Sequence, residues 1–400
     1  MENNAYKYTC IFGGGAIRGI AYVGALKALN ELGIEISTLA GSSVGSIIAS
    51  LLAVGYSTDE IYEILVGVNF DLFRDIHFGF GKTFALSKGE VFLEWLREVI
   101  EKKFYGENYK KGENPTVKFK DLDKDLVIIT TDLTNFKCKE FSKQETPDFE
   151  VATAIRISSS MPGLMSPIKY EDLELVDGDL QKSWPLWKLS ENLYPKNERV
   201  LEFRLEGDYD KNGKNAIDYV NTVYSCVTSI ATKSVVDEYG HKDSFDYVTI
   251  NTGDIVIVDF NLSKEKRKEL IDTGYKQTME YFRNYLPSKK ENLLADYKNI
   301  HSLIKNVVQN LEQGKVQNAE ISLGKVYMEL CELKENIDKK YYKKLKAAKF
   351  RLMNELKPSL ILKRYNRDAV KSIKEDFLQI EDSLNERIEE LKKTIKELKK

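Results

Sequence analysis

The strongest local pattern in this sequence is Gly41-Ser42-Ser43-Val44-Gly45. It follows an apolar run over residues 34–40 and precedes another over 47–54, which predicts a strand, a tight turn and a helix. Gly41 and Gly45 allow backbone segments to pack closely around such a turn, and Ser43 at its apex presents its hydroxyl from a helix N-terminus. Because the helix dipole favours negative charge there, we expect Ser43 to be a nucleophile in an elbow of this kind.

A glycine-rich loop lies upstream, between an expected strand over 8–12 and an expected helix over 20–32. It reads Gly13-Gly14-Gly15-Ala16-Ile17-Arg18-Gly19. Glycines between a strand and a helix let backbone amides approach an anion, either a phosphate or an oxyanion. A dinucleotide site would need an acidic residue at the end of the next strand, whereas Glu35 lies inside it. No Gly-Lys-Ser/Thr follows, so a Walker-type loop is excluded, and the serine turn downstream favours an oxyanion hole.

The third pattern is Val176-Asp177-Gly178-Asp179, at the end of an apolar stretch that predicts a strand. An Asp at the carboxyl end of a strand lies where open α/β sheets build their sites, and its carboxylate can act as a base. Asp-Gly is also a very common turn pair. Taken alone, this pattern therefore favours a turn.

Together these patterns resemble the patatin-like phospholipase family, from about Lys7 to about Tyr285. Three further segments are similar to the family's first helix, to the strand end before the Asp-Gly pair and to the segment shortly preceding that pair: residues 20–26, 131–133 and 154–163. The resemblance implies a three-layer α/β/α fold with a mainly parallel central sheet. Apolar runs with helical patterns between them agree with it, at 8–12, 125–130, 173–176, 200–204 and 247–251.

The resemblance implies a lipid acyl hydrolase that uses a Ser-Asp dyad and no catalytic histidine. Carried over residue by residue, Ser43 would be the nucleophile and Asp177 the general base. The elbow glycines would be Gly41 and Gly45, and the oxyanion hole would comprise Gly13, Gly14, Gly15, Ala16 and Arg18. The implied substrate is a membrane phospholipid, met by transient contact with a membrane surface.

The loop departs from the family pattern in one of two ways. In the better register, Ala16 takes the place of a third glycine after Gly14 and Gly15; in the other, Gly13 to Gly15 are followed by one extra residue before Arg18. Arg18 has three interpretations: it shapes the loop, it meets a lipid phosphate, or it is a surface cation.

Two further departures lie near Asp177. Asp179 stands where the family typically has Gly or Ala, and Ser183-Trp184-Pro185 lacks a common Asn. An ordinary carboxylate is a poor base at neutral pH, so we expect partial burial to raise the pKa of Asp177.

Two other functions are open. Ser43, Asp177 and His241 have the chain order of an ordinary α/β-hydrolase triad, although His241 lies in a polar, loop-like stretch. Neither His77 nor His301 is assigned to chemistry. The fold could also serve as a binding or regulatory module with little turnover, given Ala16 and Asp179.

Composition predicts a soluble, globular chain, with 42% hydrophobic and 30% charged residues. No apolar run approaches the roughly 20 residues of a membrane helix, and we expect no secretory signal. Four scattered cysteines suggest neither a metal site nor a disulfide framework, so we expect a reducing cytoplasm, no metal and no cofactor. Five phenylalanines with glycine hinges over 69–84 predict either a lid or core rings beside the site.

The chain changes character near Pro287, which predicts a hydrolase domain over 1–288 and a basic helical region over 289–400. Residues 289–400 carry 26 Lys and Arg against 18 Asp and Glu, a net +8, while 1–288 carry a net −10. We expect three to five helices with breaks near Gly314 and Pro358, the last an amphipathic helix packed on a bundle. The basic region could dock on the acidic domain, bind an activating partner or a second copy, attract anionic lipid, or be a solvated face. Interleaved acids argue against nucleic acid.

Overall fold

The computed structural model describes residues 7–69, 73, 85, 87–181, 198–207, 216–239, 243–255, 261–332, 339–355 and 366–399. The chain divides into two compact units. The first extends to Met279, and the second is Glu280–Lys400, which also takes in Asp243. The change in composition after residue 288 lies inside helix α9 (Leu286–Glu312), and the division into a hydrolase domain over 1–288 and a helical region over 289–400 stays a prediction.

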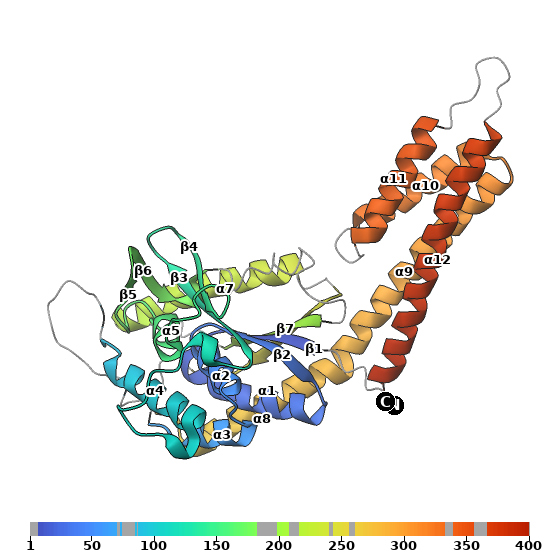
Figure 1. Ribbon diagram of the computed structural model, residues 1–400. Coiled ribbons are helices and arrows are strands. Elements are labelled where there is room, and N and C mark those ends of the chain that lie inside the picture. The colour runs from blue at the N-terminus through green and yellow to red at the C-terminus, as the bar shows by residue number, and fades with distance from the viewer. Residues whose placement is uncertain are drawn as a thin grey trace. The chain divides into compact units, whose positions relative to one another are not determined.

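The first unit is built on one eight-stranded sheet, with helices flanking it (Figure 1). The strand order is β5-β6-β3-β2-β1-β7-β8, with β4 paired to β3. The strands are β1 (Lys7–Phe12), β2 (Glu35–Gly41), β3 (Asp125–Asp132), β4 (Lys137–Ser142), β5 (Ile168–Tyr170), β6 (Leu173–Asp177), β7 (Glu198–Glu206) and β8 (Phe245–Asn251). β3, β2, β1, β7 and β8 run parallel, whereas β4, β5 and β6 join by antiparallel pairing. This confirms the expected mainly parallel sheet.

Parallel strands covered on both faces are apolar along their whole length. β3 follows this rule, because every residue after Asp125 is buried. Side chains from the five parallel strands form a common core of Ile11, Ala40, Val127, Ile129, Val200 and Phe245. The flanking helices are α1 (Ala21–Glu31), α2 (Val44–Ala53), α3 (Thr58–Gly67), α4 (Glu90–Tyr105), α5 (Val151–Ser158), α7 (Ala216–Tyr239) and α8 (Lys264–Glu280).

Short helical turns complete this unit and lead into the next. Those in the first unit are η1 (Ala16–Ile20), η3 (Gly106–Asn108), η4 (Phe119–Asp121) and η5 (Gly178–Leu180). A π-helical turn, η6 (Tyr281–Tyr285), precedes α9.

The segment expected as a lid, 69–84, lies outside the described residues except for Asn69 and Phe73. The ring of Phe73 packs on Phe92 and Trp95 of α4, with both centroid distances 5.1 Å. At this one position the ring fills a core, which was the alternative to a lid.

The described part of the second unit contains four long helices: α9, α10 (Val316–Glu332), α11 (Lys339–Glu355) and α12 (Arg367–Leu398). α9 ends just before Gly314, whose φ of 69° is left-handed, at the break the sequence predicted. The other expected break, at Pro358, lies outside the described residues. None of the helices in the described ranges combines the length and apolar character needed to cross a bilayer.

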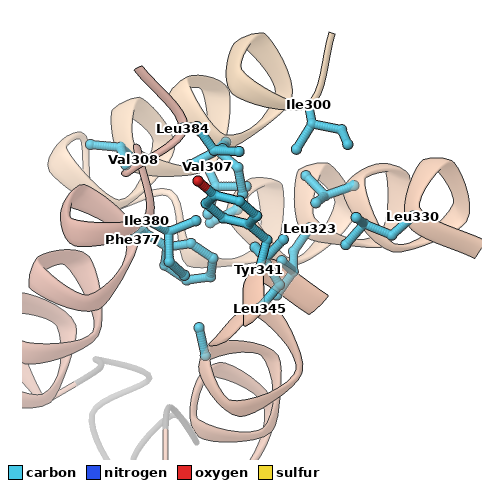
Figure 2. Close-up of a cluster of buried hydrophobic side chains, with 14 of the residues drawn as sticks. Ile300, Val307, Val308, Leu323, Leu330, Tyr341, Leu345, Phe377, Ile380 and Leu384 are labelled. Carbon is cyan, nitrogen blue, oxygen red and sulfur yellow. The ribbon is translucent and has the colours of Figure 1, made fainter. Parts of the chain in front are cut away.

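One apolar core holds these four helices together, as Figure 2 shows. α12 buries the apolar positions read from the sequence, among them Phe377 and Leu384, and packs on α9 and α11. The hydroxyl of Tyr341 donates to the carbonyl of Ser383 (3.0 Å), so α11 is also fixed to α12 by a polar bond. The prediction of an amphipathic final helix within a bundle is confirmed.

Candidate active site

Ser43 lies in the turn between β2 and α2, directly before the first residue of the helix. Its backbone has φ 51° and ψ −129°, a conformation that non-glycine residues rarely adopt and that costs of order 1–3 kcal/mol. The amide of Ser43 donates to Oγ of Ser158 (2.9 Å), and that hydroxyl donates to the carbonyl of Ile129 (2.6 Å). The turn is therefore held in its strained form by α5 and β3.

The two glycines of the turn are required by close packing. A Cβ on Gly45 would lie 1.9 Å from the carbonyl oxygen of Phe12, and one on Gly41 would lie 2.3 Å from that of Gly45. Both oxygens belong to the backbone, which cannot move aside cheaply. The start of α2 thus packs directly against the end of β1, where the glycine loop begins.

The glycine loop reaches Ser43 through Gly14. A Cβ on Gly14 would lie 2.8 Å from Cβ of Ser43. The amide of Gly13 donates to the carbonyl of Phe203 (3.0 Å), which continues the β1–β7 pairing and commits that N–H. The amides of Gly14 and Gly15, by contrast, donate to no residue in the described part of the chain. Together with the amide of Val44, the first in α2, they are the available donors beside Ser43.

Ala16 has φ 48°, in the left-handed region that favours glycine. This fits the register in which Ala16 takes the position of a third glycine. Arg18 is buried, and its Nε donates to the carbonyl of Ile255 (2.6 Å), so it is not a surface cation. Its side chain ties η1 to the segment after β8 and thereby shapes the loop.

Asp177 reaches this place for a reason different from the one expected. β6 runs antiparallel to β3, so Asp177 is not at the carboxyl end of a parallel strand. Gly41 pairs with Ile128 and Asp177 pairs with Thr130, so β3 brings the ends of β2 and β6 within two positions of each other.

The carboxylate of Asp177 is fully buried. Its Oδ1 accepts the amide of Asp179 (2.9 Å), while its buried Oδ2 accepts no hydrogen bond from any residue that the structure describes. Burial, and next the charge of Asp179, raise the pKa of Asp177 to about 7, and the hydroxyls of Ser43 and Tyr224 act in the opposite direction. The carboxyl group can therefore change its protonation state near neutral pH.

Sequence reasoning missed Tyr224, which α7 brings to Asp177. Burial, followed by the charge of Asp177, raises the pKa of Tyr224 well above its ordinary value, so the hydroxyl keeps its proton. Tyr224 also packs with Met161 in a small apolar cluster, against which Ala16, Leu164 and Leu180 lie. A single Tyr in a helical pattern gives no signal of such a role.

Asp179 belongs to a buried polar network rather than to a turn surface. The hydroxyl of Ser42 donates to its Oδ1, and Nη1 of Arg204 lies 3.5 Å from the same oxygen. Nε of Arg204 also donates to Oε1 of Glu202 (2.5 Å). Two charged residues inside the apolar run over 200–204 were the sequence signal for this network.

The remaining candidates lie elsewhere or outside the described residues. His241, His77 and Ser183-Trp184-Pro185 are outside them. His301 is on α9 in the second unit, where its Nε2 lies 3.5 Å from Oε1 of Glu381. Across the described ranges, no three His, Cys, Asp or Glu side chains form a group able to hold a metal ion.

The first unit thus places a serine elbow beside a glycine loop on a mainly parallel sheet. Residues 10–187 match the family model described as patatin-like phospholipase. This match lies within the first unit and takes in Ser43 and Asp177.

Similarity to known proteins covers different lengths of the chain. A probable lipid hydrolase of Invertebrate iridescent virus 6 is 31% identical over 193 residues, covering 45% of this chain and 62% of that protein. An uncharacterised protein of Acanthamoeba polyphaga mimivirus is 29% identical over 280 residues, covering 67% of this chain and 91% of that protein. Among solved structures, VipD from Legionella pneumophila aligns with 16% identity and a TM-score of 0.49, covering 97% of this chain and 88% of VipD.

Proposed function

We propose that this protein hydrolyses acyl esters of membrane phospholipids, a phospholipase A type of activity, through an acyl intermediate on Ser43 and with Asp177 as the base. One observation carries this proposal. Ser43, with its strained backbone at the start of α2, lies beside the buried carboxyl group of Asp177, whose pKa is raised to about 7. Support also comes from the match of residues 10–187 to the patatin-like phospholipase family model.

In the acylation step, Oγ of Ser43 attacks the ester carbonyl carbon as its proton passes to the carboxylate of Asp177. The carbonyl oxygen becomes an oxyanion, for which the amides of Gly14, Gly15 and Val44 are the available donors. One donor of this kind is typically worth about 10²–10³ in rate. The C–O bond to the alcohol then breaks, and the leaving oxygen takes the proton back from Asp177.

In the second step a water molecule replaces the alcohol. Asp177 accepts one of its protons, the resulting hydroxide attacks the acyl carbon, and the bond to Oγ of Ser43 breaks. Ser43 recovers a proton and the fatty acid leaves. A base with a pKa near the working pH serves both directions of transfer, which is what the burial of Asp177 supplies.

The apolar cluster supports a substrate with an acyl chain. Met161 and Tyr224 are buried there, and Ala16 brings the cluster to the end of the glycine loop. An acyl chain whose ester is held at Ser43 would find apolar contacts on this side. We also propose that the enzyme contacts the membrane surface transiently from the cytoplasm. A partner or a second copy at residues 289–400 stays a prediction.

The test is fatty-acid release from mixed phosphatidylcholine and phosphatidylglycerol vesicles by the wild type, Ser43→Ala and Asp177→Asn, each checked for folding by circular dichroism. We expect release by the wild type alone. Ser50→Ala is a matched control on the same helix, because the Ser50 hydroxyl bonds to no described residue. Equal release by wild type and Ser43→Ala would contradict the site.

Two further measurements separate the alternatives. A fluorophosphonate should label Ser43 in the wild type and fail to label Ser43→Ala, whereas a pure binding module would not react at all. His241→Ala should retain activity if the dyad is right, and a loss of more than about a hundredfold would favour the Ser-Asp-His triad.

A further inference from the structure

β7 carries buried charged side chains where a central parallel strand normally carries apolar ones, and two of them lie toward its carboxyl end. Glu202 is fully buried and Arg204 is 5% exposed. The guanidinium of Arg204 bridges two carboxylates, with Nε on Oε1 of Glu202 (2.5 Å) and Nη1 near Oδ1 of Asp179 (3.5 Å). Charges taken this far out of water are costly unless they are paired. The burial of Glu202 and Arg204 on β7 thus needs an explanation other than a gain in stability.

The Arg204–Asp179 pair lies directly against the glycine loop. A Cβ on Gly13 would lie 2.7 Å from Cδ of Arg204, and one on Gly14 would lie 2.1 Å from Oδ2 of Asp179. The missing side chains at these two positions make room for the ion pair. The backbone that offers the Gly14 amide to Ser43 is therefore supported by Arg204 on one residue and by Asp179 on the next.

We propose that Arg204 is a positioning residue of this site, where it neutralises Asp179 beside Asp177 and holds Gly13 and Gly14 next to Ser43. The proposal rests on the proposed function, because it assigns Arg204 a part in the chemistry of Ser43 and Asp177. It explains why this chain carries Asp179 at the position after Asp177-Gly178. The carboxylate of Asp179 is paired with the positive charge of Arg204 on β7.

The charge around Asp177 is set by groups from several elements. Asp179 on η5, Ser43 in the elbow and Tyr224 on α7 face it directly. Around Arg204 and Asp179 lie Glu202 on β7, Tyr247 on β8 and Tyr22 on α1. On α5, Arg156 donates to Oγ of Ser160, whose carbonyl accepts the amide of Asp177.

Removing the guanidinium would leave Glu202 and Asp179 without the cation that pairs with both of them. A more negative surrounding favours the protonated form of Asp177, so this base would become active only at higher pH. Removing the charge of Asp179 instead would leave Arg204 less compensated and act in the opposite direction. Opposite shifts from two contacting residues would not arise from loss of structure alone.

The test is the pH dependence of kcat/KM with a soluble p-nitrophenyl ester, for the wild type, Arg204→Met, Asp179→Asn and the double variant. We expect the acid limb to move up by about one pH unit in Arg204→Met and down by a similar amount in Asp179→Asn. The double variant should lie near the wild type. Arg204→Lys, which keeps the charge, should retain the wild-type limb and lose rate.

Arg199→Met is the matched control. Arg199 is also buried on β7 and pairs with a carboxylate, Asp246 (2.8 Å), but it lies at the opposite end of the strand from the loop. We expect its acid limb to match that of the wild type. If Arg204→Met does not fold, Arg204→Lys carries the test, because a wild-type rate in that variant would contradict the positioning role.

The two proposals fail in different ways. An acid limb that stays at the wild-type pH in both Arg204→Met and Asp179→Asn, while Ser43 of the wild type still reacts with a fluorophosphonate, overturns the role of Arg204 alone. A wild type that neither hydrolyses the ester nor reacts at Ser43 overturns the proposed function, and this inference with it.

Discussion

The backbone amide of Ser43 donates to Oγ of Ser158 at 2.9 Å, which ties the turn before α2 to the last residue of α5. The same hydroxyl donates to the carbonyl of Ile129 (2.6 Å), so one buried side chain satisfies two backbone groups from different elements. The position of the Ser43 hydroxyl therefore depends on Ser158.

Ser158→Ala should lower kcat/KM for ester hydrolysis by about ten- to a hundredfold, because a small displacement of a nucleophile is costly. It should also lower the free energy of unfolding by about 1–3 kcal/mol, since two buried backbone groups lose their partner. Ser159→Ala is the control, as the Ser159 hydroxyl bonds to no described residue. Equal kinetics for the two variants would contradict this role.

The rate should depend on pH through Asp177. A base with a pKa of about 7 must be deprotonated to act, so kcat/KM should rise with pH to a midpoint near 7 and then level off. The profile is measured with a soluble ester. His241→Ala should leave the midpoint unchanged, and a profile that is already flat from pH 5 upward would show that the pKa of the base is not raised.

The free energy of unfolding of the first unit should fall as the pH rises, whereas the rate rises. The ordinary pKa of an Asp is 3.8, so between about pH 4 and 7 the folded state keeps a proton that the unfolded chain has lost. This contribution declines as the pH rises through that window. The side chain in Asp177→Asn does not titrate. The free energy of unfolding of this variant, relative to that of the wild type, should therefore rise by about 1–3 kcal/mol between pH 5 and pH 8. Urea titrations at the two pH values measure it. A constant difference would mean that the pKa is not raised.

Ala16→Gly should relieve backbone strain. At φ 48° an alanine is disfavoured, and glycine there should stabilise the first unit by up to about 1 kcal/mol, after its greater freedom in the unfolded chain is counted. Ala16→Val should destabilise it by more than that. Thermal melts compare the three proteins, and a valine variant as stable as the wild type would be evidence against the left-handed conformation.

The core of the second unit should respond to truncation at Leu384, which is fully buried on α12. Leu384→Ala should cost about 2–5 kcal/mol in unfolding free energy. Phe350→Ala on α11, where the ring is 68% exposed, should change it by less than about 0.5 kcal/mol. Denaturation followed by circular dichroism at 222 nm measures both. Similar costs for the two variants would show that α12 does not form this core.

The sequence predicted the sheet well where strands are buried on both faces, as for β1 and β3. It missed β4 (Lys137–Ser142) and β5 (Ile168–Tyr170), because β4 mixes charged with apolar residues and β5 has only three residues. The turn at Ser43 and the glycine loop could be predicted because tight backbone packing requires glycines, and these are visible in the local sequence.

The residues that surround Ser43 and Asp177 were harder to predict from the sequence. Tyr224 and Arg204 lie far along the chain from Ser43, and only the sheet order and the packing of α7 bring them close. Nothing in the spacing of residues encodes that approach. The antiparallel direction of β6 was missed for the same reason, since it depends on pairing with β3 rather than on the strand's own residues.

The close contacts at Gly14, Gly41 and Gly45 divide the active site into two parts for protein engineering. At these three positions a single added methyl group would meet main chain, Asp179 or Ser43. Almost no substitution there should yield an active protein in a mutagenic library. The apolar cluster of Met161, Leu164 and Leu180 is bounded by side chains, which can repack around a substitution. Selection for a different acyl length would therefore be directed at that cluster.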